Sequence, residues 1–160
     1  MKNRKDFSRL ILSWYQENKR DLPWRKTKNP YKIWVSEIIL QQTQISQGTS
    51  YYLNFINRFP DLNSLAKASE SDVLKVWEGL GYYSRAINML NNAKLLVEQS
   101  KSLFPHNFDD LIKLKGIGEY TAAAISSICN NEKRAVLDGN VFRVISRVFN
   151  ISHPINNTSG

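Results

Sequence analysis

Two acidic side chains are the residues of this sequence whose types and surroundings could do chemistry. The first, Glu37, lies in the segment YKIWVSEIILQQT, where the positions three and four residues away hold Ile33, Trp34, Leu40 and Gln41 and no basic residue. Desolvation by such neighbours raises the pKa of a carboxyl group, as a general acid requires. A structural glutamate paired across the fold with one of the 22 Lys and Arg residues explains the pattern equally well.

The second acidic residue, Asp138, precedes an apolar run in the segment AVLDGNVFRVISRVF. Asp-Gly between apolar runs is a hairpin signal, but apolar residues recur at helical spacing from Val141 to Phe149. We therefore predict a helix that begins beside Asp138, where the helix dipole favours the ionised carboxylate; an ordinary N-cap has the same sequence. One protonated and one ionised carboxyl group suit cleavage of an N-glycosidic bond, with an acid for the departing base and an anion beside the sugar cation.

Two glycine turns could hold nucleic acid near such a pair. The stretch LIKLKGIGEYTAAAISSI predicts a helix, a turn at Gly116 and Gly118, and a second helix beginning near Glu119. Backbone N–H groups in this turn can bind phosphate, although a plain helix–turn–helix corner has the same pattern. The second turn, GLGYY, carries Tyr82, which can stack on bases or anchor a buried turn. The run LQQTQ after Glu37 suits base edges or an ordinary polar helix end.

The elements that must position these residues are helical throughout. No run of alternating strand pattern is present, so we predict an all-α fold. Helices are expected over residues 7–16, 30–43, 51–59, 61–66, 69–77 and 85–97, ahead of the glycine turn and the helix after Asp138.

Composition limits the partners and the kinds of site. The 160 residues carry a net charge of +8, which suits a polyanion such as nucleic acid. Cys129 is the one cysteine, so there is no intrachain disulfide, and neither it nor the two histidines suggests a metal site. No membrane span or signal peptide is apparent. We expect a monomer in the bacterial cytoplasm that associates with the nucleoid through its function.

Taken together, the motifs resemble the helix-hairpin-helix, Gly/Pro…Asp superfamily of DNA glycosylases. LKGIGEYTAAAI followed by LDGNVFRV is similar to that superfamily, and LPWR, PYKIWVSEIILQQTQ and WEGLGYYSRA look like the adenine DNA glycosylases of the MutY type, which excise adenine mispaired with 8-oxoguanine. Four motifs agree in order and spacing over residues 7–150. The resemblance implies two helical lobes with the active site between them. Residues 1–28 would form an N-terminal helix and loop that belong to the second (cluster) lobe. Residues 29–135 would form a six-helix lobe with the helix-hairpin-helix. Residues 136–160 would be the start of the chain's second pass through the cluster lobe, which is incomplete and truncated here.

The same resemblance implies residue roles. Glu37 would protonate N7 of the adenine, and Asp138 would stabilise the sugar cation. Tyr120 stands where relatives of the endonuclease III type place a nucleophilic lysine, which favours a monofunctional glycosylase that uses water. The remaining roles are hydrogen-bond support from Tyr120 and Asn140, contacts around the adenine from Arg20, Trp24 and Leu40, probing or wedging of the duplex by Gln42 and Tyr82, and phosphate contacts at Gly116 and Gly118.

The implied partner is double-stranded DNA containing a mismatched adenine opposite 8-oxoguanine or guanine. The family also carries a [4Fe-4S] cluster on four cysteines and a C-terminal domain for 8-oxoguanine; both would lie beyond Gly160 and are absent from this chain. The chain is therefore expected to be a fragment, with exposed apolar surface, that binds DNA poorly or is inactive alone. The alternatives are a thymine or uracil mismatch glycosylase, an endonuclease III-like enzyme, and a non-catalytic helix-hairpin-helix DNA-binding module.

Overall fold

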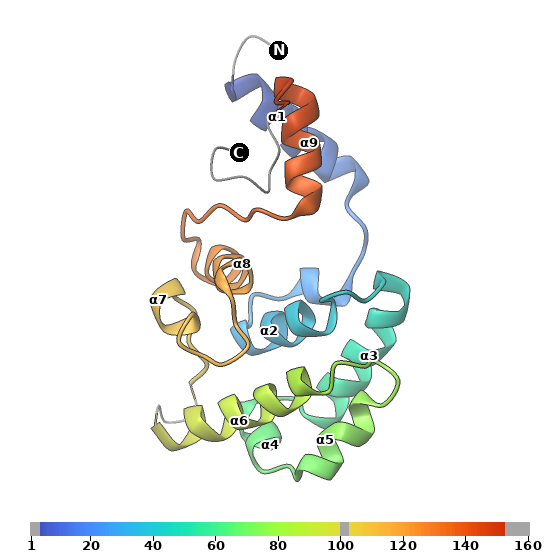
Figure 1. Cartoon of the computed structure of the whole chain (residues 1–160), viewed down its shortest axis with the longest axis vertical. Helices are drawn as coiled ribbons and strands as arrows, with labels where there is room; N and C mark the ends of the chain where they lie inside the picture. Colours follow the sequence, from blue (N-terminus) through green and yellow to red (C-terminus); the bar gives the residue numbers. More distant parts are fainter. Residues whose placement is uncertain (1–3, 100–102, 153–160) are drawn as a thin grey trace. The chain divides into compact units, whose positions relative to one another are not determined.

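The computed structural model describes residues 4–99 and 103–152, and within these residues every regular element is a helix (Figure 1). The predicted all-α class is confirmed for this part of the chain. The chain divides into two compact units, of which the first combines Met1–Asp21 with Val136–Gly160 and the second is Leu22–Ala135. No helix in the described ranges is long and apolar enough to cross a lipid bilayer.

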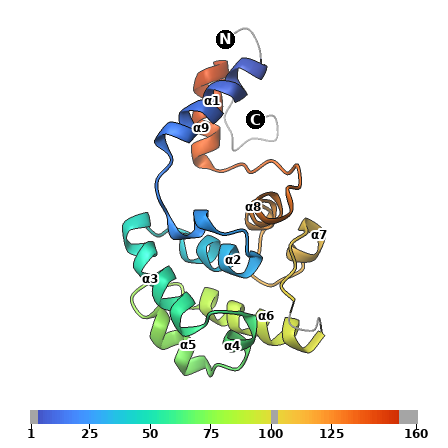
Figure 2. The same cartoon turned by 180° about the vertical axis from the view of Figure 1, so that it is seen from behind.

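The larger unit holds a short 3-10 helix and a set of α-helices built around α2 (Figures 1 and 2). Helix α2 packs against α3 and α8, while α6 packs against α4 and α5. The elements are η1 (Pro23–Lys26), α2 (Pro30–Ile39), α3 (Ile45–Arg58), α4 (Leu62–Ala66), α5 (Glu70–Trp77), α6 (Ser84–Gln99), α7 (Phe108–Leu111) and α8 (Glu119–Asn130).

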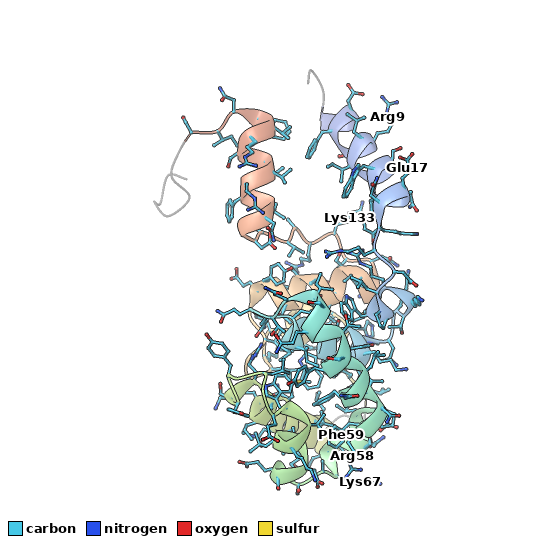
Figure 3. All side chains as sticks on the ribbon, turned by 90° about the vertical axis from the view of Figure 1, so that its right-hand side faces the viewer. Arg9, Glu17, Arg58, Phe59, Lys67 and Lys133 are labelled. Atoms are coloured by element: carbon cyan, nitrogen blue, oxygen red, sulfur yellow. The ribbon has the colours of Figure 1, made fainter. Side chains whose placement is uncertain are left out.

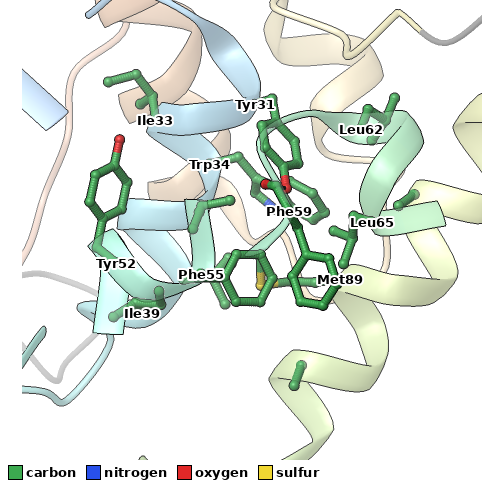
Figure 4. Packing of buried hydrophobic residues seen from close by; sticks show 14 of the residues in the cluster. Tyr31, Ile33, Trp34, Ile39, Tyr52, Phe55, Phe59, Leu62, Leu65 and Met89 are labelled. Carbon is green, nitrogen blue, oxygen red and sulfur yellow. Dashed lines mark hydrogen bonds between the residues drawn. The ribbon is translucent and has the colours of Figure 1, made fainter. Parts of the chain in front are cut away.

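Helix α2 forms because its first turn is well capped and because most of its residues are apolar. The Asn29 side chain caps the helix by accepting a hydrogen bond from the Lys32 N–H (3.1 Å), and Pro30 occupies the first turn. The helix then runs through the core, where aromatic side chains of α2 and α3 meet (Figure 4). Trp34 is fully buried, and the Tyr31 hydroxyl donates to the carbonyl of Phe59 at 2.7 Å.

Local capping explains why the two short helices α4 and α5 are where the sequence pattern predicts them. Asp61 and Ser64 form a reciprocal capping box at the start of α4, and Ser69 and Asp72 form another at the start of α5. Each box satisfies backbone N–H groups that have no partner inside the helix. Neither helix is long enough to be stable alone, so both depend on the core beneath them.

The largest differences from the predicted helix boundaries concern three helices, α2, α3 and α7. Helix α2 ends at Ile39 rather than near residue 43, because Gln42 adopts a left-handed backbone conformation (φ 57°). Helix α3 consequently begins at Ile45, six residues earlier than the pattern indicates. The helix ahead of the glycine turn is the four-residue α7, which ends at Leu111, and Asn107 caps it by accepting from the Asp110 N–H.

The smaller unit contains helices α1 (Arg4–Asn18) and α9 (Gly139–Phe149). They touch through the rings of Phe7 and Phe149, whose centroids lie 5.5 Å apart in an edge-to-face arrangement. Much of their apolar surface is nevertheless exposed; Trp14, for example, is 61% exposed. The other large exposed apolar side chains on these two helices are Leu10, Ile11, Leu12, Tyr15, Val144, Val148 and Phe149.

Candidate active site

Glu37 lies in the last turn of α2, and its carboxyl group is largely buried. The residue is only partly exposed, and desolvation by burial raises the pKa of its carboxyl group to about 7. Among the described residues of the larger unit, no Lys or Arg pairs with it, and no hydrogen bond reaches its carboxyl group. The geometry of this unit therefore does not support the alternative of a glutamate neutralised by a structural ion pair.

Two exposed side chains stand on strained backbone close in sequence to the core helices. Gln42 follows α2 and is exposed, with φ 57°. Tyr82, in the turn between α5 and α6, is 66% exposed and has φ 48°. A non-glycine residue in the left-handed region costs free energy and persists only where the surrounding structure enforces it. Gln42 and Tyr82 belong to the residues expected to probe the duplex, whereas the other described non-glycine residues with positive φ, Asn131 and Asn150, are the C-caps of α8 and α9.

The residues expected around the base have contrasting surroundings. Trp24, in η1, is buried and packs edge-to-face on Tyr52, with ring centroids 5.3 Å apart. Like the buried Leu22 it lies in the larger unit, which begins at Leu22. The resemblance groups residues 1–28 with the second lobe. Leu40 is partly buried at the end of α2. Arg20 lies in the smaller unit and is exposed.

The glycine turn is anchored from α6 and leads directly into α8. Asn92 is buried and donates from its side-chain amide to the carbonyl of Lys115 at 2.9 Å. Gly116 has φ 83°, and an added Cβ would lie 3.0 Å from the amide nitrogen of Asn88, so both backbone geometry and space favour glycine there. Gly118 is the exposed N-cap of α8 and has no side-chain cap, which leaves this helix start open to an anion.

Tyr120 lies in the first turn of α8 and is 43% exposed. It is the second residue of the helix, two positions after the N-cap Gly118. At the adjacent position, the hydroxyl of Thr121 receives a hydrogen bond of 3.4 Å from the side-chain amide of Gln41. This bond links the start of α8 to the segment that carries Gln42.

Asp138 is the N-cap of α9, and the hairpin alternative for this residue is wrong. Its Oδ1 accepts from the backbone N–H groups of Asn140 (2.9 Å) and Val141 (2.8 Å). Its Oδ2 accepts a longer bond, 3.4 Å, from the Asn140 side-chain amide, whose oxygen in turn accepts from Arg143 at 2.6 Å. The cap uses mainly one carboxylate oxygen and leaves the other oxygen for a further contact.

The larger unit thus brings most of the predicted site residues onto a single packed body. The smaller unit carries the predicted anion, Asp138, and the residue expected to support it, Asn140. Arg20, Asp138 and Asn140 belong to the smaller unit. The predicted site residues in the larger unit are Trp24, Glu37, Leu40, Gln42, Tyr82, Gly116, Gly118 and Tyr120.

In the described part of the chain, no group of side chains forms a ligand set for a metal or for an iron–sulfur cluster. Among residues 4–99 and 103–152, no three His, Cys, Asp or Glu side chains gather as a ligand set. Cys129 is the one cysteine of the sequence, and burial raises the pKa of its thiol to about 11, away from the thiolate that a metal needs. The residues present therefore do not fit a [4Fe-4S] cluster, and the chemistry below uses none.

Sequence reasoning missed Arg85, which lies in the first turn of α6. Its guanidinium donates to the backbone carbonyls of Ile38, Gln41 and Gly81 and lies 5.4 Å from the centre of the Trp77 ring. The available signal was an arginine directly after a turn rich in glycine and aromatic residues. Nothing in sequence spacing, however, shows that this arginine reaches the end of a helix more than forty residues earlier.

Comparison with known proteins places this fold and site in a class. Residues 35–158 match the model of the HhH-GPD superfamily base excision DNA repair protein, and the chain belongs to this family. Among curated sequences it is 47% identical over 146 residues to an adenine DNA glycosylase of Buchnera aphidicola, covering 91% of this chain and 42% of that protein. It is also 42% identical over 151 residues to the human adenine DNA glycosylase, covering 89% of this chain and 28% of that protein.

Solved structures agree with the family. A thermostable thymine-DNA glycosylase superposes with a TM-score of 0.83 at 30% identity, covering 89% of this chain and 66% of that one. An endonuclease III–DNA complex superposes with a TM-score of 0.75 at 16% identity, covering 93% and 70% respectively, which bears on the fold alone. The helix-hairpin-helix glycosylase fold is therefore confirmed. The chain spans less than half the length of the curated relatives that it matches.

Proposed function

We propose that this chain carries base-releasing residues of an adenine DNA glycosylase, which acts as a monomer on double-stranded DNA in the bacterial cytoplasm and removes adenine mispaired with 8-oxoguanine or guanine. The observation that carries the proposal is the partly buried, unpaired Glu37 carboxyl group, whose pKa is raised to about 7 by desolvation. A group with this pKa is about half protonated at neutral pH, so it can hold a proton and still give it up.

In the proposed reaction, Glu37 donates its proton to N7 of an adenine that has been turned out of the duplex. Protonation lets the bond between C1′ and N9 break, with the bonding electron pair leaving on the base. The sugar becomes an oxocarbenium ion, and the Asp138 carboxylate stabilises its positive charge. A water oxygen then adds to C1′ and its proton passes to the Glu37 carboxylate, which leaves an abasic sugar, free adenine and a reprotonated Glu37.

Two further features support DNA as the substrate. The net charge of +8 favours association with a phosphate backbone, and the release of counterions makes such binding sensitive to salt. The open start of α8 at Gly118 offers backbone N–H groups to a phosphate without a competing side-chain cap. We assign Gly116 and Gly118 to this contact, and Gln42 and Tyr82 to the probing of the bases.

Tyr120 supports hydrolysis by water rather than lyase chemistry. A phenol cannot form the Schiff base with C1′ that an amine nucleophile forms. The Asn140 side chain donates a hydrogen bond to Asp138. We therefore assign Tyr120 and Asn140 to the support of the proton donor Glu37 and of the anion Asp138. Borohydride should therefore trap no covalent complex between the protein and a substrate duplex.

The test is single-turnover release of adenine from a duplex with adenine opposite 8-oxoguanine, using the product of the complete open reading frame that encodes these residues. We expect Glu37→Gln to slow release by about 10²- to 10⁴-fold and Asp138→Asn by about 10²- to 10³-fold. Asparagine caps helices as well as aspartate does, so the Asp138 variant should keep its fold. Unchanged release in the Glu37 variant would overturn the proposal.

Matched controls separate chemistry from folding. Asp61→Asn changes the N-cap of α4, where the side chain accepts from the Ser64 N–H at 2.8 Å in the same way that Asp138 caps α9. Glu70→Gln removes an exposed carboxylate from the first turn of α5. Both control variants should release adenine at the wild-type rate.

A second candidate function is removal of thymine mispaired with guanine. It is supported by the likeness to the thermostable thymine-DNA glycosylase at 30% identity. The same assay with a thymine–guanine duplex decides between the two, because the base that is released identifies the substrate. Binding to both duplexes without release of either base would indicate a non-catalytic DNA-binding module.

A further inference from the structure

Arg85 connects two segments that are far apart in the sequence. One nitrogen, Nη1, donates to the carbonyl of Ile38 at 2.9 Å and to that of Gln41 at 2.6 Å. The other, Nη2, donates to the carbonyl of Gly81 at 3.4 Å. The guanidinium also lies over the rings of Trp77 and Tyr82, at 5.4 and 5.3 Å from their centres. One side chain therefore holds the end of α2 and the turn before α6.

The chemistry of these contacts fits arginine in particular. The last carbonyls of a helix have no partner within the helix, and a cation there also complements the helix dipole. The planar fork of a guanidinium can donate in several fixed directions while its face lies on an aromatic ring. A lysine ammonium carries the same charge but cannot reproduce this combination of bonds and stacking.

Each of the two linked segments carries one exposed side chain on left-handed backbone. Gln42 comes directly after the bonded carbonyl of Gln41, and Tyr82 comes directly after that of Gly81. The turn is further fixed by the indole N–H of Trp77, which donates to the same Gly81 carbonyl at 3.0 Å. The strained conformations of both residues are thus next to carbonyl groups that Arg85 holds.

We propose that Arg85 is a positioning residue that fixes Gln42 and Tyr82 as one preset unit, so that the two side chains engage the duplex together. This inference rests on the proposed function, because it assigns the contact between these side chains and DNA to that reaction. Arg85 touches neither the base nor the reacting atoms in this assignment. It acts through the backbone of the two segments.

The first test is amide hydrogen exchange in the absence of DNA, which does not depend on activity. Arg85→Lys should raise the exchange rate in residues 40–44 and 79–83 together, because both lose the same anchor. Arg58→Lys is the matched control: Arg58, labelled with Phe59 in Figure 3, pairs with Asp72 at 3.3 Å and lies 5.6 Å from the centre of the Phe59 ring. Faster exchange in one segment alone would contradict the coupling.

The second test is a mutant cycle in the rate of base release, and a residue with a purely structural role would give a different result in it. Arg85→Lys should slow base release by about 10- to 100-fold, as displacement of positioning groups does. In a protein that already carries Gln42→Ala and Tyr82→Ala, the same change should have little further effect, because the side chains that Arg85 positions are gone. Multiplied losses in the combined variant would overturn the proposal.

A third variant keeps the inference testable if Arg85→Lys does not fold. Trp77→Phe removes the indole hydrogen bond to Gly81, places a smaller ring in the core and keeps an aromatic face beside Arg85. If Arg85 couples the segments, exchange should rise in residues 40–44 as well as in 79–83. A change confined to 79–83 would refute it.

These outcomes are distinguishable from failure of the proposed function. A wild-type protein that releases no base would remove the enzyme assignment, while the exchange experiment would still report whether the segments are coupled. A protein that releases adenine but shows independent segments and multiplied losses would remove only the role of Arg85.

Discussion

Replacing Glu37 by glutamine should change the pH dependence of folding as well as the reaction. Glutamine has nearly the same shape as a protonated glutamic acid and cannot ionise. In the native protein, burial raises the pKa of the Glu37 carboxyl group from its ordinary value of 4.5 to about 7. The variant therefore reports how strongly the core resists a negative charge at this position.

The expected magnitude follows from the pKa shift. One pKa unit corresponds to about 1.4 kcal/mol, so the ionised carboxylate destabilises the native state by about 3 kcal/mol relative to the protonated form. Below pH 4.5 the carboxyl group is protonated in both the folded and unfolded states. Between 4.5 and about 7 the native state keeps a proton that the unfolded chain has lost, so wild-type stability falls as pH rises.

The assay is urea unfolding followed by tryptophan fluorescence at several pH values from about 4.5 to about 8.5. Relative to its value at the lowest pH, the unfolding free energy of Glu37→Gln should exceed that of the wild type by about 3 kcal/mol above neutral pH. Glu70→Gln, at an exposed position, measures the effect of removing a carboxylate from the surface. A difference between wild type and Glu37→Gln that stays constant with pH would refute the argument from desolvation.

The remaining predictions concern the glycine turn, the core and the cysteine. Gly116→Ala should lower the unfolding free energy by about 1–3 kcal/mol in a thermal melt, because φ is 83° and the new Cβ meets Asn88. Gly118→Ala has open space around it, so it should fold normally but bind duplex DNA more weakly in a titration; unchanged affinity would contradict a phosphate contact there. Trp34→Ala should lower the unfolding free energy by about 3–5 kcal/mol in urea, since the ring is fully buried. Burial raises the pKa of Cys129 to about 11, so a maleimide should label it slowly in the native protein near pH 8 and rapidly after unfolding.

Helical elements were predictable wherever periodicity and capping agree. The capping boxes at Asp61 and Ser69 mark two helix starts that the sequence pattern also indicates. The helical spacing after Asp138 correctly excluded a hairpin at that aspartate. The partial burial of Glu37 was predictable as well, because its apolar neighbours are only one turn away along the same helix.

Contacts between distant segments could not be predicted in this way. The early end of α2 depends on the left-handed Gln42, and the polar run around that residue is compatible with either a helix or a loop. The bonds from Arg85 to Ile38 and Gln41 span more than forty residues, and spacing along the chain carries no information about such pairs. The anchoring of the glycine turn by Asn92 has the same long-range origin.

The position of Glu37 on a core helix ties its acid strength to the temperature. Warming that loosens the packing around α2 lets water reach the carboxyl group before the chain as a whole unfolds. Hydration returns the pKa of Glu37 toward that of an ordinary glutamate, so the side chain loses the proton that it must donate. Under the proposed mechanism, heat inactivation should therefore begin below the melting temperature, and cooling should reverse it.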